Sequence, residues 1–226
     1  MATFVLIPGA GGTAWYWHRV EPLLRGRGHD VVAVDLPAGD DAAGLAEYAD
    51  AVVAAIGDRT GLVLVAQSMA GFTAPLVCSR LDVDLLILVN AMIPAPGESP
   101  GDWWANTGHE EARVAQARRD GRPEEFDAVA DFFHDVPAEV TAAAFAEGEP
   151  PQSGTPFARP WPLKRWPDVP TRFLQGRDDR FFPLEFQRRL ARERLGLAID
   201  DMPGGHLVAL SHPEELARRL ASYVAT

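Results

Sequence analysis

The chain has 226 residues, 47% of them hydrophobic, which is enough to bury one substantial core. The 32 Asp and Glu residues outnumber the 21 Lys and Arg residues, and the formal charge of −11 argues against nucleic-acid and membrane partners. A single cysteine, Cys78, excludes an intramolecular disulfide and a cysteine-based zinc site. Lys164 is the only lysine, and no phosphate-binding glycine loop precedes it, so most lysine chemistry is excluded.

The start of the chain carries no targeting signal that we can identify. The first apolar run, Phe4 to Ile7, follows no basic segment and is too short for a signal peptide. No window approaches the run of about 18 apolar residues that a membrane span needs. We therefore expect a mature, cytoplasmic protein.

Apolar runs and helical periodicity alternate along the chain. Six runs predict buried strands, at Thr3–Ile7, Asp30–Val34, Leu62–Ala66, Asp84–Val89, Thr171–Leu174 and Leu197–Asp201. Five segments between and after them predict helices, at Trp15–Arg27, Ala42–Ile56, Ser68–Ser79, Leu184–Leu195 and Pro213–Val224. Residues 211–214, Ser-His-Pro-Glu, are typical of a capping box before the last helix. The alternation predicts an α/β fold, a mainly parallel sheet of about six strands with helices on both faces.

One segment, residues 94–168, interrupts this alternation. It holds 11 of the 19 prolines, four of the six tryptophans, and 14 acidic residues against 7 basic ones. It has no convincing strand; its periodicity predicts helices at Glu110–Arg119, Glu124–Phe133 and Ala138–Ala146, followed by an irregular loop over Glu147–Pro162. We expect a mostly helical cap, or lid, inserted into a core formed by residues 1–93 and 169–226.

Three residues at predicted strand ends form a candidate catalytic set. Ser68 follows the third strand, Asp179 the fifth and His206 the sixth. Functional residues gather at the carboxyl ends of strands in open parallel sheets. A serine hydroxyl becomes a strong nucleophile when an imidazole takes its proton and a carboxylate orients that imidazole. The order Ser, Asp, His therefore predicts a serine nucleophile, its base and its orienting acid, with Asp178 as the competing acid.

The residues around Ser68 fit a sharp turn from strand to helix. Ala66 and Ala70, two positions before and after the serine, are small enough for such a turn. The N–H of Met69, at a helix N-terminus, can then donate to a developing oxyanion. The glycine-rich loop after the first strand brings a second donor, which we assign to the N–H of Ala10.

At these positions the sequence resembles the α/β-hydrolase superfamily, in particular the small esterase branch that includes the plant methyl esterases and hydroxynitrile lyases. The resemblance is clearest from Phe4 to Asp35 and continues through Ser68, the Gly-x-x-Asp-x-x-x-Pro pattern ending at Pro183, and Gly205-His206. It implies the α/β-hydrolase fold and a triad of Ser68, His206 and Asp179. It also implies oxyanion donors at Ala10 and Met69, a carboxylesterase activity, and no metal or organic cofactor.

The chain departs from the family pattern beside the serine and in the first loop. Alanines replace the glycines that usually flank the nucleophile, and Pro8 replaces a histidine that is not a triad member. Nothing in the sequence explains Pro8. Hydroxynitrile lyases of this branch carry a threonine at the position of Gly9 and a lysine directly after the histidine, where this chain has Leu207. Ester hydrolysis is therefore favoured over cyanide chemistry, and thioesters and lactones remain open as substrates.

Two other interpretations remain open. Residues 9–14 fit the dinucleotide-binding fingerprint, and Asp35 follows at about the required distance of 20 residues. This NAD(P)-dependent oxidoreductase interpretation explains only the first 36 residues and finds no Tyr/Lys pair for hydride transfer. The chain could also be a non-catalytic, small-molecule-binding member of the fold.

No sequence motif in the cap indicates which of its residues contact the substrate. We expect weak candidates for a substrate pocket among its aromatic residues and one neighbouring methionine: Met92, Trp103, Trp104, Phe132 and Phe133. We expect His109 and His134 at the surface of the cap, with a contact to the substrate as the alternative, and Cys78 in the core. The cap carries −7 of the total −11 charge, so neutral or cationic acyl compounds should enter more readily than anions. A homodimer is compatible with the sequence, which does not fix the oligomeric state.

Overall fold

The computed structural model describes residues 1–224 and contains one sheet of six parallel strands, as predicted. Their spatial order is β2-β1-β3-β4-β5-β6. All neighbouring strands pair in parallel, so every connection crosses over one face of the sheet. The strands are β1 (Thr3–Ile7), β2 (Asp30–Ala33), β3 (Leu62–Gln67), β4 (Leu85–Val89), β5 (Thr171–Gly176) and β6 (Asp200–Met202).

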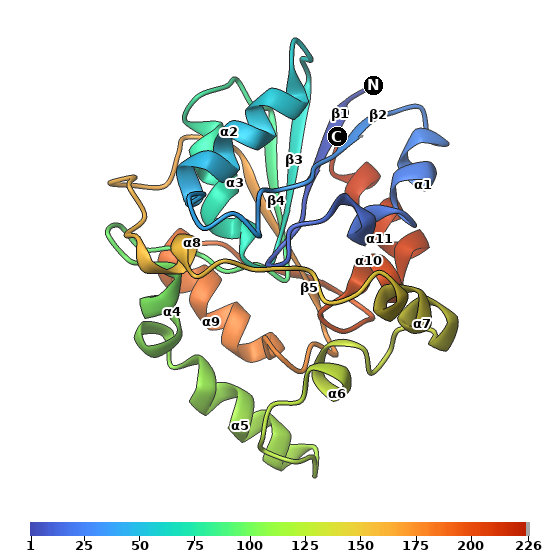
Figure 1. Ribbon diagram of the computed structural model, residues 1–226, viewed down its shortest axis with the longest axis vertical. Helices are drawn as coiled ribbons and strands as arrows, with labels where there is room; N and C mark the ends of the chain where they lie inside the picture. Colours follow the sequence, from blue (N-terminus) through green and yellow to red (C-terminus); the bar gives the residue numbers. More distant parts are fainter. Residues whose placement is uncertain (225–226) are drawn as a thin grey trace.

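Helices cover both faces of this sheet (Figure 1). Alternate residues of a strand point to opposite faces: Val5 and Ile7 of β1 belong to one hydrophobic cluster, and Phe4 and Leu6 to the other. The first cluster packs against α2 (Leu45–Ile56), α3 (Ala70–Cys78) and α9 (Leu184–Leu195). The second packs against the 3-10 helix at Ala14–Trp17, α1 (Glu21–Arg25), α10 (Val208–Ser211) and α11 (Pro213–Ser222).

Residues 94–168 leave the sheet after β4 and return at β5. In Figure 1 this segment lies across the end of the sheet where the strands have their carboxyl ends. Two buried indoles join it to the core, because Trp103 Nε1 donates to the Ile93 carbonyl and Trp161 Nε1 to the Phe72 carbonyl, both at 3.0 Å. Its helices are α4 (Pro100–Thr107), α5 (His109–Arg119), α6 (Ala128–Phe132), α7 (Ala138–Ala146) and α8 (Thr155–Ala158).

Several predicted helix boundaries were wrong, and the causes are local. The helix expected over Trp15–Arg27 is split, because Pro22 lacks an N–H and occupies the first turn of a new helix, α1. The helix expected from Glu124 begins only at Ala128, where the Asp127 carboxylate caps it by accepting the Ala130 N–H. Helix α4 was not predicted, and α8 lies within the stretch expected to be irregular.

The end of the chain also differs from the prediction. The last strand is shorter and later than expected, at Asp200–Met202, because residues after the left-handed Gly196 pack as loop. The predicted capping box does not form, since Ser211 belongs to α10 and no side chain caps α11. No helix within residues 1–224 is both long and apolar enough to cross a membrane.

Candidate active site

Ser68 occupies a strained turn between β3 and α3. Its φ angle of 53° lies in the left-handed region, which residues other than glycine rarely adopt. The Met92 N–H donates to the Ser68 carbonyl at 2.9 Å. A Cβ at Gly71 would lie only 1.8 Å from the Met92 carbonyl oxygen, so this position needs glycine. The turn thus holds a half-buried serine at the carboxyl end of a fully buried strand.

The structure brings the three predicted residues together. His206 Nε2 lies 3.1 Å from Ser68 Oγ, and His206 Nδ1 lies 2.9 Å from Asp179 Oδ2. His206 and Asp179 are each only 3% exposed. These distances allow a continuous hydrogen-bonded chain from the serine hydroxyl to a buried carboxylate, the arrangement that activates a hydroxyl nucleophile.

The Asp179 carboxylate is held by more than the histidine. Its Oδ1 accepts the N–H groups of Phe181 at 2.8 Å and Phe182 at 2.9 Å, and its Oδ2 also accepts Gln175 Nε2 at 3.2 Å. These bonds satisfy a buried charge and fix the orientation of the carboxylate. Asp178, in contrast, is exposed and accepts the Gly204 N–H at 3.1 Å, so it stabilises the neighbouring loop.

Three buried amide side chains, which the sequence interpretation missed, surround this chain of hydrogen bonds. Asn90 donates to the carbonyls of Gly205 at 2.9 Å and His206 at 3.0 Å, and accepts the Gly176 N–H. Gln67 accepts the Gly9 N–H at 3.1 Å, and Gln175 donates to Asp179. Each of the three is a polar residue at or just beyond the end of an apolar strand. The triad was predicted from that same feature, which could therefore also have indicated these amides.

The two predicted oxyanion donors flank the serine. Met69 directly follows Ser68 and is the N-cap of α3. Ala10 follows Gly9, where a Cβ would lie 2.8 Å from the Ser68 Cβ, so the first loop packs directly on Ser68. Within residues 1–224 we find no protein acceptor for either N–H, whereas the next one, from Gly11, donates to Gln152 Oε1 at 2.8 Å.

Aromatic rings surround the imidazole of His206. The ring centroids of Phe132, Phe181 and Phe182 lie 5.1, 5.3 and 5.1 Å from that of His206. The ring of Trp104 extends this cluster, 5.6 Å from the Phe181 ring. Two of the five weak pocket candidates, Phe132 and Trp104, therefore join an apolar wall next to the imidazole.

The other three pocket candidates belong to the cores. Met92 and Trp103 are 1% and 0% exposed in the first hydrophobic cluster. Phe133 packs against Phe145 of α7, with ring centroids 5.2 Å apart, at the second cluster. Tertiary packing separates Phe133 from its neighbour Phe132, which points to His206.

The surface placement predicted for His109 and His134 was wrong. His109 is 4% exposed, its Nε2 lies 2.8 Å from the Phe181 carbonyl, and burial lowers its pKa. The His134 side chain is 11% exposed, and burial lowers its pKa too. Cys78 packs against the first cluster, and burial raises the pKa of its thiol to about 12. No group of three or more His, Cys, Asp or Glu side chains in the described chain is arranged to hold a metal ion.

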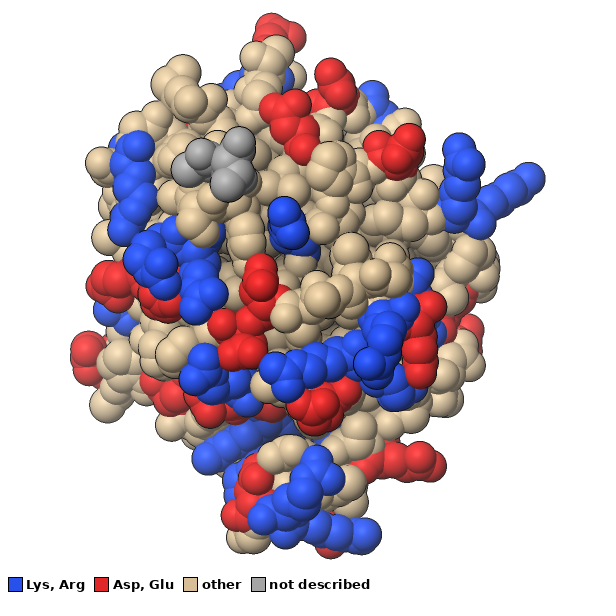
Figure 2. Space-filling model, turned by 180° about the vertical axis from the view of Figure 1, so that it is seen from behind, with Lys and Arg blue, Asp and Glu red and all other residues tan. Residues whose placement is uncertain are grey.

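Charged side chains of both signs are interleaved on the face shown in Figure 2. Within residues 94–168, Arg113 pairs with Glu110 at 2.6 Å, and Arg122 with Asp131 at 3.1 Å. Such pairing neutralises charges locally. It leaves the net charge of the segment at −7, because acidic residues outnumber basic ones by 14 to 7.

Comparisons with known proteins identify the family and the fold of the chain. The model of the alpha/beta hydrolase family matches residues 4–219. A rice protein named probable esterase PIR7A (Oryza sativa subsp. indica) is 37% identical over 112 residues, which cover 43% of this chain and 42% of that protein. The pyrethroid hydrolase of Sphingobium wenxiniae is 28% identical across 97% of this chain and 86% of its own. The crystal structure of polyneuridine aldehyde esterase matches with a TM-score of 0.81 at 22% identity, over 99% of each chain.

The match to the rice protein spans less than half of its length, and the identity to the solved structure is low. The likeness to the solved structure therefore concerns the fold. The family match extends over nearly the whole chain, including Ser68, Asp179 and His206.

Proposed function

Because the chain belongs to the alpha/beta hydrolase family, we propose that it is a serine hydrolase that cleaves carboxylic esters. The observation that carries this proposal is the chain of hydrogen bonds from Ser68 Oγ through His206 to Asp179, with distances of 3.1 and 2.9 Å. The names of its relatives, which include esterases and a pyrethroid hydrolase, support the same class of reaction.

In the proposed reaction, His206 Nε2 takes the proton of the Ser68 hydroxyl as Oγ attacks the ester carbonyl carbon. The negative charge that develops on the carbonyl oxygen is held by the N–H groups of Ala10 and Met69. The imidazolium then protonates the leaving alcohol, and the acyl-enzyme remains on Ser68. Water, deprotonated by His206, attacks this intermediate and releases the carboxylic acid.

Asp179 keeps the imidazole in the productive tautomer. Its carboxylate accepts Nδ1–H, so that Nε2 is free to take the serine proton. The bonds from Gln175, Phe181 and Phe182 hold the carboxylate in place before the imidazolium forms. The phenyl rings around His206 lower the local polarity, which strengthens these charge interactions.

We further propose that residues 94–168 act as a cap that selects the substrate. Phe132 and Trp104 come from this segment, and Phe181 comes from the core, so the apolar wall is built from both parts. This wall favours an apolar acyl or alcohol group, and the net charge of −7 on the segment disfavours anions. The same machinery would hydrolyse thioesters and lactones.

A fluorophosphonate probe tests the proposed nucleophile. We expect the folded protein to be labelled once, and mass spectrometry to locate the modification on Ser68. Heat-denatured protein, in which the three side chains are apart, should not be labelled. If the folded protein is not labelled, the proposed hydrolase is contradicted and the non-catalytic, ligand-binding interpretation is favoured.

A substrate screen then identifies the acyl preference. We expect turnover of p-nitrophenyl esters to depend on acyl length, because the apolar wall has a fixed size. Thioesters and lactones measured alongside them separate the three classes of acyl compound.

A further inference from the structure

The loop that carries His206 is held by a side chain from the 94–168 segment. Asp135 Oδ2 accepts the N–H of Gly205, the residue before His206, at 2.7 Å. Asp135 lies in the stretch between α6 and α7, 70 residues earlier in the chain. The hydrolysis mechanism described above does not use this carboxylate.

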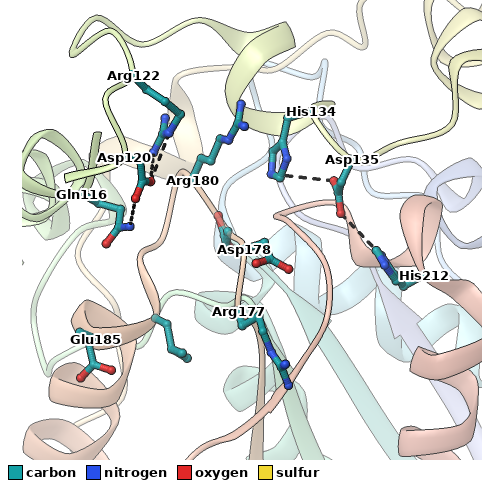
Figure 3. A pocket seen from close by; sticks show the side chains of 12 residues that line it. Gln116, Asp120, Arg122, His134, Asp135, Arg177, Asp178, Arg180, Glu185 and His212 are labelled. Atoms are coloured by element: carbon teal, nitrogen blue, oxygen red, sulfur yellow. Dashed lines mark hydrogen bonds and ion pairs between the residues drawn. The ribbon is translucent and has the colours of Figure 1, made fainter. Parts of the chain in front are cut away.

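The Gly205 N–H lies closer to the Asp135 carboxylate than the two neighbouring histidine rings do. Figure 3 shows Asp135 between His134 and His212, whose ring nitrogens lie 3.9 Å from Oδ1 and 3.6 Å from Oδ2. Among the described residues, Oδ1 is buried without a hydrogen-bond partner. The Gly205 N–H is therefore the one hydrogen-bond donor that we find for this carboxylate within residues 1–224.

The backbone of the loop is shaped to allow this approach. A Cβ at Gly205 would lie 2.6 Å from His134 Nε2 and 2.8 Å from Asp135 Oδ1. Both distances are shorter than ordinary Cβ contacts, so a larger residue at position 205 would push the His134 and Asp135 side chains away from the loop. The position of the loop thus depends on the position of residues 134 and 135.

A second contact from the same stretch reaches the next residue. The Phe132 ring lies over the His206 imidazole, with centroids 5.1 Å apart and planes 30° apart. From the side of the sheet, Asn90 binds the carbonyls of Gly205 and His206. The core thus fixes the carbonyl groups of the loop, and the 94–168 segment fixes an N–H and the imidazole ring.

We propose that Asp135 is a positioning residue for His206. By accepting the Gly205 N–H, it sets the loop so that Nε2 stays within reach of Ser68 Oγ. The distance between Ser68 Oγ and His206 Nε2 therefore depends on how the 94–168 segment packs on the core. This inference rests on the proposed hydrolase function, because it assigns Asp135 a role in that reaction.

Amide hydrogen exchange tests the contact without relying on activity. In the Asp135→Ala variant, we expect the Gly205 amide to exchange at least about tenfold faster than in the wild type, because its acceptor is gone. Asp135→Asn keeps an oxygen acceptor and should retain the protection. Equal exchange in the wild type and Asp135→Ala would overturn the proposal.

Kinetics on the best ester from the screen test the consequence. We expect Asp135→Ala to lower kcat about 10- to 100-fold with little change in KM, the size of loss that a displaced catalytic group produces. Asp135→Asn should stay within about threefold of the wild type, because positioning needs the acceptor and not the charge. A kcat of Asp135→Ala within about twofold of the wild type would contradict the proposal, as would equal losses in both variants.

Asp41→Ala is the matched control. The Asp41 carboxylate also joins the core to the segment, by accepting the Ser153 hydroxyl at 2.9 Å, but it does not touch the loop of His206. We expect Asp41→Ala to keep the wild-type kcat. A loss as large as that of Asp135→Ala would show that any weakened contact of the segment has this effect, and would overturn a specific role for Asp135.

If Asp135→Ala does not fold, the Asp135→Glu variant tests the same proposal. Asp135→Glu keeps the charge and both oxygens but moves them by one methylene, so it should fold and still lower kcat. Full kcat in Asp135→Glu would contradict the proposal. If the wild type itself neither binds the fluorophosphonate nor turns over any ester, the proposed function fails, and the exchange of the Gly205 amide still decides whether Asp135 sets the loop.

Discussion

The carboxyl end of the sheet and the 94–168 segment are held together by different interactions. At the sheet, buried neutral amides and backbone groups fix the polar side chains: Asn90 binds the loop of His206, and Gln175 binds Asp179. In the segment, several ion pairs are exposed at the surface, such as that between Arg118 and Glu124. The reactive geometry therefore depends on interactions that solvent and salt hardly reach.

The segment owes its place to a few buried contacts rather than to its many charges. Exposed ion pairs contribute about 0–1 kcal/mol each. The buried indoles of Trp103 and Trp161 remove large apolar surfaces from water and satisfy carbonyl groups of the core. A region rich in charge is thus anchored by apolar side chains.

The largest expected effect is on the chemical step at the sheet. Replacing Ser68 with alanine removes the proposed nucleophile, and we expect kcat to fall by about 10⁴-fold or more while the thermal unfolding temperature stays near that of the wild type. Ser79→Ala, at the other end of α3, is the control and should keep full activity, since the Leu76 carbonyl is the one partner that we find for its hydroxyl within residues 1–224. Turnover that survives in Ser68→Ala would disprove the mechanism.

The next largest effect is on stability, and it distinguishes buried side chains of the segment from exposed ones. Trp103→Ala leaves a cavity and removes one of the two donors to the Ile93 carbonyl, the other being Arg194, and should destabilise the protein by about 3–5 kcal/mol. For a chain of this size that lowers Tm by about 10 °C. Phe145→Ala, on a side chain that is 55% exposed, should change stability by less than about 0.5 kcal/mol. Similar Tm values for the two variants would refute apolar anchoring.

A smaller effect concerns the buried ion pair between the segment and α9. Burial alone would raise the pKa of Glu98, but hydrogen bonds from Arg194, Asn106 and the Ala95 N–H outweigh it and hold the pKa below its ordinary value of 4.5. A depressed pKa stabilises the fold above about pH 4.5 and loses this contribution as the pH falls through the lowered value.

Glu98→Gln tests this pair through the pH dependence of Tm. We expect the difference in Tm from the wild type to be largest near pH 7. It should shrink as the pH falls from about 4.5 through the lowered pKa, where the carboxylate of the folded wild type becomes protonated. Glu124→Gln removes a charge from an exposed pair and should show a smaller difference at pH 7. A Tm difference for Glu98→Gln that is independent of pH would contradict this assignment.

The smallest expected effect is electrostatic selection by the segment. Between matched esters of one size, kcat/KM should be higher for the neutral than for the anionic one, and the ratio should approach one as salt is added. Ion pairs within the segment, such as those of Arg113 with Glu110 and of Arg122 with Asp131, neutralise part of its charge locally, so we expect a difference of only a few-fold. An anionic ester with the higher kcat/KM and no salt dependence would overturn selection by charge.

Much of the core could be predicted because its signals are local. A strand buried on both faces is an uninterrupted apolar run, and β1 was located at Thr3–Ile7 without error. The carboxyl ends of parallel strands meet at one edge, so the positions of Ser68, Asp179 and His206 along the chain implied their proximity. The family match to residues 4–219 is consistent with that prediction.

Local signals were weaker wherever contacts between distant residues decide the outcome. The sequence does not distinguish Phe132, whose ring covers His206, from Phe133, which packs against α7. It also placed His134 at the surface, although packing against Gly205 buries it.

By itself, the sequence determined the parallel sheet, the order of its catalytic candidates and the long stretch without a strand between the fourth and fifth strands, because periodicity and turn residues act over a few positions. Only the tertiary structure decided that Asn90, just after β4, and Asp135, in the 94–168 segment, both bind the loop of His206. These contacts join residues 70 or more positions apart. Their geometry follows from how the segment packs on the sheet, and patterns over a few neighbouring residues do not indicate it.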